Sequence, residues 1–253
     1  MIPEWNKQRS DNLLMLINIV SSIGLSMWLR MLILAVLCLM LSIPALAHGV
    51  AQGDASFIET AIGVQLLPFI YLGAKHMVTG YDHLLFLIGV IFFLYRLKEV
   101  SLYVTLFALG HSTTLLFGVL SGTEINAWLV DAIIGLSVVY KALDNLNAYP
   151  QWFGFQPDAR FAVLIFGFFH GFGLATKLQD FSLSEDGLIP NILAFNVGVE
   201  IGQLLALTGI LILMNLWRRT ASFNRHAVWA NGALMTAGFV LMGYQLTGYW
   251  ITI

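Results

Sequence analysis

The sequence predicts an all-α, polytopic membrane protein with six transmembrane helices, one re-entrant or interfacial segment and a preceding signal peptide. Of its 253 residues, 58% are hydrophobic and only 10% are charged, and the mean hydropathy is +0.82. This composition is too apolar for a water-soluble globule. The formal net charge is −2 and like charges do not form long runs, so no nucleic-acid-binding surface is expected.

A signal peptide is predicted for residues 1–47. Arg30 is followed by an apolar run and then by the small-residue site Ala45-Leu46-Ala47, which is the pattern of a cleavage site. Translation from Met27 would give a signal of ordinary length. Cleavage would make His48 the first residue of the mature chain, whereas an uncleaved signal anchor is the alternative.

The rest of the chain, residues 48–253, is expected to form a single membrane domain. A helix that crosses a bilayer needs about 20 mainly apolar residues, and six runs meet this pattern: 81–95, 101–120, 128–146, 160–178, 188–217 and 228–251. A shorter apolar piece, residues 61–77, contains Pro68 and Gly73. Six crossings leave no room for a seventh, so this piece is expected to be re-entrant or interfacial.

The positions of lysine and arginine predict the orientation, because cytoplasmic loops carry an excess of both. Every second predicted connection is basic, namely those with Arg96 and Lys98, with Arg160, and with Arg218, Arg219 and Arg225. We therefore expect a multi-pass protein of the inner (plasma) membrane, with the mature N-terminus and the C-terminus outside the cytoplasm. Lys75 and Lys177 are exceptions to the pattern.

Ionisable residues inside apolar segments are costly and indicate function by default. The candidate metal ligands are His48, His76, Asp82, His83, His111, His170 and Glu200, and the candidate supporting residues are Asn196, Gln203, Lys141 and Asp144. A rise of about 1.5 Å per residue places His111, His170 and Glu200 well inside the bilayer, and His76, Asp82 and His83 at its outer edge. The expected site lies in the outer half of the membrane.

Spacing along the helices indicates which side chains share a face. Asn196, Glu200 and Gln203 stand at i, i+4 and i+7 and should lie together. The glycine pairs 198/202 and 167/171 have the GxxxG spacing that lets helices approach closely. Lys141 is expected to pair with Asp144 or with Asn145 within one polar stripe.

Each candidate also has a purely structural interpretation. A single buried histidine such as His111 or His170 can simply hydrogen-bond a neighbouring helix. Glu200 can be a protonated acid that holds Gln203 or a backbone carbonyl. Asp82 can be the N-cap of a helix.

The ligand types restrict which metals are suitable. The single cysteine, Cys38, lies in the predicted signal region, so a thiolate site is not expected. Imidazole, carboxylate and carbonyl ligands suit nickel, zinc, cobalt, copper or iron, and the sequence does not choose among these divalent transition-metal ions.

Four segments together resemble the HupE/UreJ family, and most closely its second subgroup. They are Gly80-Tyr81-Asp82-His83-Leu84-Leu85-Phe86, Leu109-Gly110-His111-Ser112-Thr113-Thr114-Leu115, 166–175 around His170, and 195–204 around Glu200. The resemblance covers roughly residues 48–213. It implies a six-span membrane protein with a cleaved signal and, through the association of the family with hydrogenase and urease maturation, a permease for nickel or a related divalent metal.

Three functions therefore stay open at this stage. The first is a metal permease, without a phosphate-binding loop for nucleotide-driven transport. The second is a membrane-embedded metalloenzyme with Glu200 as acid and base, for which no HExxH motif is present. The third is an accessory protein that delivers metal to metalloenzyme maturation proteins. Membrane lipid and the metal ion are the expected partners.

Overall fold

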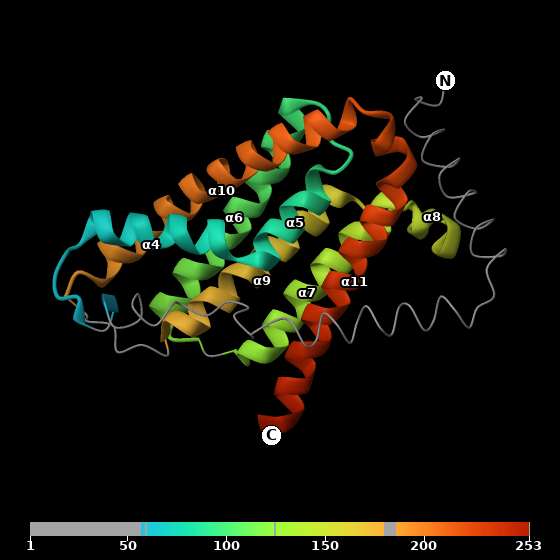
Figure 1. Cartoon of the computed structure of the whole chain (residues 1–253). Coiled ribbons are helices and arrows are strands. Elements are labelled where there is room, and N and C mark those ends of the chain that lie inside the picture. Colours follow the sequence, from blue (N-terminus) through green and yellow to red (C-terminus); the bar gives the residue numbers. More distant parts are fainter. Residues whose placement is uncertain (1–56, 59, 124, 180–185, 253) are drawn as a thin grey trace.

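The computed structural model describes residues 57–252, except residues 59, 124 and 180–185 (Figure 1). In this part of the chain every regular element is a helix: α4 (Leu66–Thr79), α5 (Tyr81–Ile91), α6 (Leu97–Ser121), α7 (Ala127–Asn145), α8 (Ala148–Phe153), α9 (Ala159–Gln179), α10 (Leu188–Arg218) and α11 (Ala221–Thr252). The all-α prediction is confirmed for these residues. The predicted signal peptide and His48 lie outside the described residues.

Four of these helices are long and apolar enough to cross a membrane. They are α6, α9, α10 and α11, whose most apolar windows have mean hydropathies between 1.2 and 2.0. At least half of each window faces away from the rest of the protein, since 28–50% of it is buried. The protein is therefore a membrane protein with apolar helix faces exposed to lipid.

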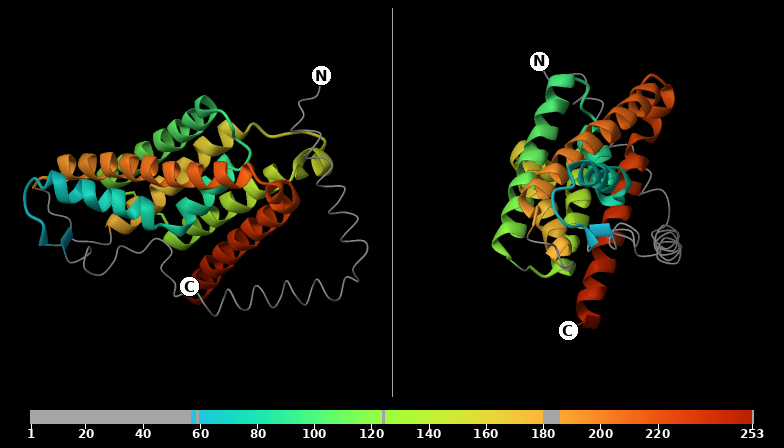
Figure 2. Two further views of the ribbon diagram at one scale, coloured as in Figure 1. Left: turned by 45° about the horizontal axis from the view of Figure 1, so that its top comes forward. Right: turned by 90° about the vertical axis from the view of Figure 1, so that its left-hand side faces the viewer.

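The first close helix pair is α4 with the N-terminal half of α10, which Figure 2 shows running alongside each other. Glycines bring the two backbones together. A β-carbon on Gly73 would lie 2.0 Å from the carbonyl oxygen of Phe195, and one on Gly198 would lie 2.0 Å from that of Ile70. At the start of the pair, Asn191 accepts a hydrogen bond from the backbone N–H of Gln65. Residues later in α4 contact residues later in α10, so the two helices run parallel.

The other two close pairs are α6 with α9 and α7 with α11. Gly167 and Gly171 of α9 touch the backbone of α6 beside Phe107 and His111, as their GxxxG spacing predicts. In the other pair Gly135 meets Met242 while Gly248 meets the ring of Trp128. Figure 1 shows α7 and α11 side by side, and the order of their contacts makes them antiparallel.

Three arginines mark one end of the bundle, which we call the arginine end: Arg96 before α6, Arg160 at the start of α9 and Arg218 at the end of α10. Arg96 and Arg160 line one common pocket. The Arg218 guanidinium donates hydrogen bonds to the carbonyls of Ile91 and Phe92 and so satisfies carbonyls at the end of α5 that lack helical partners. The basic connections predicted from sequence thus lie together.

Residues 61–77, expected to be re-entrant or interfacial, contribute most of the regular helix α4. Pro68 falls in the first turn of α4, where a missing N–H does no harm. Gly73 serves the contact with α10. The chain breaks only at Gly80, which has φ −71° and ψ 107°, and continues as α5 to Ile91, beside Arg218. Together α4 and α5 form one interrupted helix, of which α4 packs along α10 and α5 packs mainly on α7.

Candidate functional site

Four histidines from four helices meet around the break between α4 and α5. The imidazole ring centroid of His83 lies 5.1 Å from that of His76 in α4, 6.2 Å from that of His111 in α6 and 5.0 Å from that of His170 in α9. We call these four residues the histidine cluster. The four imidazoles thus lie close together, and their role as metal ligands stays a prediction.

The cluster sits at a different depth from the one expected. His111 and His170 occupy the middles of α6 and α9, and His83 packs against both. His76, Asp82 and His83 therefore lie at the centre of the bundle and not at its outer edge. The sequence estimate was wrong because it began the first crossing at Tyr81, whereas α4 precedes it and runs along α10.

Burial and hydrogen bonds orient two of the imidazoles. His83 and His170 are fully buried. His83 Nδ1 lies 3.0 Å from Asp82 Oδ1, and His170 Nδ1 lies 2.7 Å from the carbonyl oxygen of Phe166. Because a carbonyl and an ionised carboxylate only accept hydrogen bonds, both Nδ1 atoms act as donors. The Nε2 lone pair of each ring is then the atom that could bind a metal. Asp82 does not cap α5, since Gly80 holds the N-cap position.

His111 is buried, and its ring has no hydrogen-bond partner among the described residues. Its side chain is 1% exposed, and neither ring nitrogen forms a hydrogen bond with the described residues. Buried polar atoms without a partner are rare and call for an explanation such as a ligand. The neighbouring hydroxyls do not supply one, because Thr113 and Thr114 donate to the backbone carbonyls of Leu109 and Phe168.

The cluster is not a closed metal cage as it stands. Ligands of one zinc ion lie about 2.0–2.1 Å from it. Within the described part of the chain, no three His, Cys, Asp or Glu side chains are close enough together to hold one ion in this way. The cluster does offer imidazole nitrogens, which are suitable metal ligands. The ring of His83 neighbours each of the other three rings. This geometry fits successive binding of a cation better than tight storage.

The predicted face of Asn196, Glu200 and Gln203 is divided in the structure. Asn196 and Gln203 are buried, and Asn196 accepts a hydrogen bond from Ser112. Glu200 is exposed on the outside of α10. The structure therefore brings Asn196 near the helix that carries His111, and it leaves Glu200 out of the histidine cluster.

The predicted polar stripe of α7 is buried and contains the expected ion pair. Lys141 pairs with Asp144, which also accepts a hydrogen bond from Gln156. Asn145 instead donates to the carbonyl of Gly89 and to Asn231, so it joins α5, α7 and α11. Lys141 and Asp144 both line the pocket at the arginine end.

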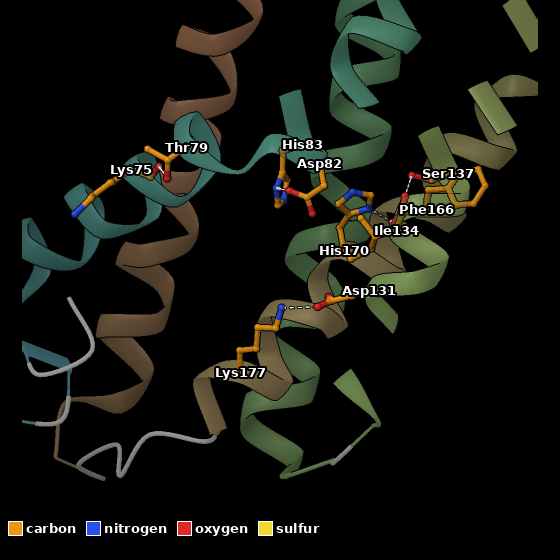
Figure 3. A network of polar contacts seen from close by, with 10 residues as sticks. All are labelled: Lys75, Thr79, Asp82, His83, Asp131, Ile134, Ser137, Phe166, His170 and Lys177. Carbon is orange, nitrogen blue, oxygen red and sulfur yellow. Dashed lines mark hydrogen bonds and ion pairs between the residues drawn. The ribbon is translucent and has the colours of Figure 1, made fainter. Parts of the chain in front are cut away.

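Sequence reasoning missed two features next to the cluster. The first is an ion pair between Asp131 of α7 and Lys177 of α9, with 2.6 Å between Oδ2 and Nζ (Figure 3). It explains why Lys177 departs from the charge pattern, and Asp131 was detectable as an acid inside an apolar run. The second is a layer of phenylalanines: the rings of Phe107 and Phe86 lie 4.9 Å and 5.5 Å from that of His170.

Figure 3 shows how these groups are placed. Asp82 and His83 extend from the first turn of α5 toward His170. The Lys177–Asp131 ion pair lies further along α9, away from the helix break. A buried charged pair thus stands between the imidazoles and the end of the bundle opposite the arginines.

Comparison with known proteins identifies the family. No curated protein and no solved structure matches the chain. A family model described as HupE / UreJ protein matches residues 52–253, a range that includes the histidine cluster and all eight described helices. The chain therefore belongs to the HupE/UreJ family.

Proposed function

We propose that this protein is a permease that carries a divalent transition-metal cation, such as nickel or cobalt, across the inner membrane. The observation that carries the proposal is the meeting of four imidazoles at a helix break in the centre of an apolar bundle. Imidazole nitrogen is a good ligand for these ions, and four polar rings buried among apolar helices need a function that repays their cost.

The break at Gly80 supports transport. Secondary transporters often bind their substrates near the bilayer midplane, at helices interrupted in just this way. The interruption between α4 and α5 places His76 on one side of the break and Asp82 and His83 on the other. A cation bound there could be passed between rings as the two half-helices shift.

The proposed topology has six crossings. The α4–α5 unit would form the first, followed by α6, α7, α9, α10 and α11. The packing directions support this count, because α4 and α10 run parallel and α7 and α11 run antiparallel. The positive-inside rule would place the arginine end in the cytoplasm and, with an even number of crossings, both mature termini outside.

The proposal is tested with purified protein in proteoliposomes. We expect uptake of Ni²⁺ or Co²⁺ by the wild-type protein and at least a tenfold loss with His83→Ala, because His83 contacts the other three rings. The matched control is His226→Ala, since His226 is exposed in α11 and, within the described part of the chain, hydrogen-bonds to Ser222. Equal uptake by His83→Ala and wild type, or the same loss with His226→Ala, would refute the proposal.

A further inference from the structure

A pocket of about 890 Å³ opens at the arginine end. Its wall combines the end of α5, the start of α6, the end of α7 and the start of α9. Charged side chains of both signs line it, namely Arg96, Glu99, Lys141, Asp144, Asp158 and Arg160. A pocket with such a lining is a place for water and not for lipid tails.

The inner wall of the pocket and the histidine cluster lie on the same two helices, α5 and α6. Val90, which lines the pocket, follows His83 by two turns of α5. Tyr103, which also lines it, precedes His111 by about two turns of α6. At about 1.5 Å per residue, the cluster and the pocket are roughly 10–12 Å apart along both helices.

One layer of aromatic rings fills this interval. Phe86 lies one turn before Val90, and Phe107 lies one turn after Tyr103. Their rings are 5.3 Å apart, and that of Phe166 is 6.1 Å from that of Phe86. Phe86 and Phe107 are buried, with 1% and 2% of their surfaces exposed. We call these three residues the phenylalanine layer.

We infer that the pocket is the inner mouth of the metal pathway and that the phenylalanine layer is its closed barrier. This inference rests on the permease function proposed above. Hydrophobic constrictions close pores by excluding water, and the layer separates two polar compartments that face it from opposite sides. Displacement of the rings of Phe86 and Phe107 would join the cluster to the pocket.

The chemistry of the pocket suits release of a cation. Glu99, Asp144 and Asp158 supply carboxylate oxygens, which bind nickel-like ions less strongly than imidazole nitrogen does. The positively charged side chains in the same wall repel a metal cation and so keep its binding weak. Asp144 already accepts hydrogen bonds from Lys141 and Gln156. A cation leaving the cluster would exchange imidazole for water here, and weak binding lets it depart.

The barrier can be tested without any metal transport. We would replace Cys38 with serine, introduce Val90→Cys as a probe of the pocket wall, and treat oriented vesicles from either side with a membrane-impermeant cationic methanethiosulfonate. Leu109→Cys, on the exposed face of α6, is the matched control. We expect the Val90 probe to react only from the arginine-end side and the Leu109 probe to react from neither.

The phenylalanine layer is then opened by Phe86→Ala, with Phe86→Leu as a control that keeps a large apolar side chain. Silver ions, which are small and bind thiols, are added from the opposite side. We expect silver to react with the Val90→Cys thiol at least about tenfold faster in the Phe86→Ala variant than in the protein with Phe86 or in the Phe86→Leu variant. The reason is that removal of the ring leaves a gap that water can enter.

Two results would overturn the inference. One is reaction of the Val90 probe at equal rates from both sides with Phe86 intact, and the other is an unchanged silver rate in Phe86→Ala vesicles that react normally from the arginine end. Neither depends on Ni²⁺ uptake. Normal sidedness without uptake would refute the permease alone, whereas uptake with equal reaction from both sides would refute the barrier alone.

Discussion

Gly80 and His83 are so close that a β-carbon on Gly80 would lie 2.6 Å from Nδ1 of the histidine ring. The residue that interrupts the first helix therefore also leaves room for the imidazole at the centre of the cluster. Its backbone angles, φ −71° and ψ 107°, are open to any residue. The requirement for glycine here comes from the neighbouring ring and not from backbone strain.

Gly80→Ala should accordingly weaken metal binding while the protein still folds. The added methyl group must push the His83 ring away from Asp82 and from the other imidazoles. We expect about a tenfold loss of Ni²⁺ affinity, or roughly 1.4 kcal/mol, by isothermal titration of the purified protein. Gly232→Ala is the control, because nothing lies within 4 Å of a β-carbon there. Equal affinities in the two variants would contradict the prediction.

Asp82→Asn should weaken Ni²⁺ binding by about 10- to 100-fold, the usual effect of removing the carboxylate that orients a ligating histidine. The carboxylate fixes the proton of His83 on Nδ1, 3.0 Å away, and an amide can present either a donor or an acceptor. The measurement is Ni²⁺ affinity, with the thermal unfolding midpoint as a check on folding. Wild-type affinity in Asp82→Asn would show that the tautomer of His83 is not fixed by this contact.

Much of the fold and of the site was predictable from sequence. Hydropathy located the long helices, and GxxxG spacing predicted the close approach of Gly198 and of Gly171 to neighbouring backbones. The cost of burying polar groups predicted that the histidines would gather. These properties depend on local spacing or on composition, which a sequence carries directly.

The parts that failed depend on which helices pack together. The depth of His83 follows from the parallel pairing of α4 with α10, which no local pattern encodes. The side of α10 that is buried is likewise set by its neighbours. Asn196, Glu200 and Gln203 are close on a helical wheel, yet Glu200 falls just beyond the buried stripe. Asp131 and Lys177 are 46 residues apart in the chain, so only the three-dimensional structure shows that they pair.

The Asp131–Lys177 pair should be important for stability. The side chains are 5% and 17% exposed, and removal of one partner leaves a buried charge. We expect Asp131→Asn to lower the free energy of unfolding by about 3 kcal/mol, as measured by denaturant titration in detergent. The double variant Asp131→Asn/Lys177→Met should recover at least half of this loss. Additive losses would show that the two residues do not act as a pair.

The contact between α4 and α10 should depend on the absence of a side chain at Gly198. A β-carbon there would overlap the backbone of Ile70, and overpacking of this kind costs about 3 kcal/mol. Gly209→Ala in the same helix meets nothing within 4 Å and should stabilise the protein by about 0.5–1 kcal/mol. Thermal unfolding midpoints of the two variants should therefore move in opposite directions, and a shift of the same sign in both would contradict this packing.

Glu200→Gln separates what the sequence pattern suggests from what the structure places together. The sequence pattern makes Glu200 a candidate metal ligand, so loss of its charge would abolish metal binding. In the structure its side chain is exposed on α10 and forms no hydrogen bond or ion pair with the described residues, while the imidazoles lie inside the bundle.

We therefore expect Glu200→Gln to bind Ni²⁺ within about twofold of the wild-type affinity, a change below 0.5 kcal/mol, whereas His83→Ala loses at least tenfold. Titration of both variants with Ni²⁺ measures the difference directly. A Glu200→Gln protein that folds but no longer binds Ni²⁺ would mean that α10 turns this carboxylate inward when the metal is bound, and the histidine cluster would then be only part of the binding site.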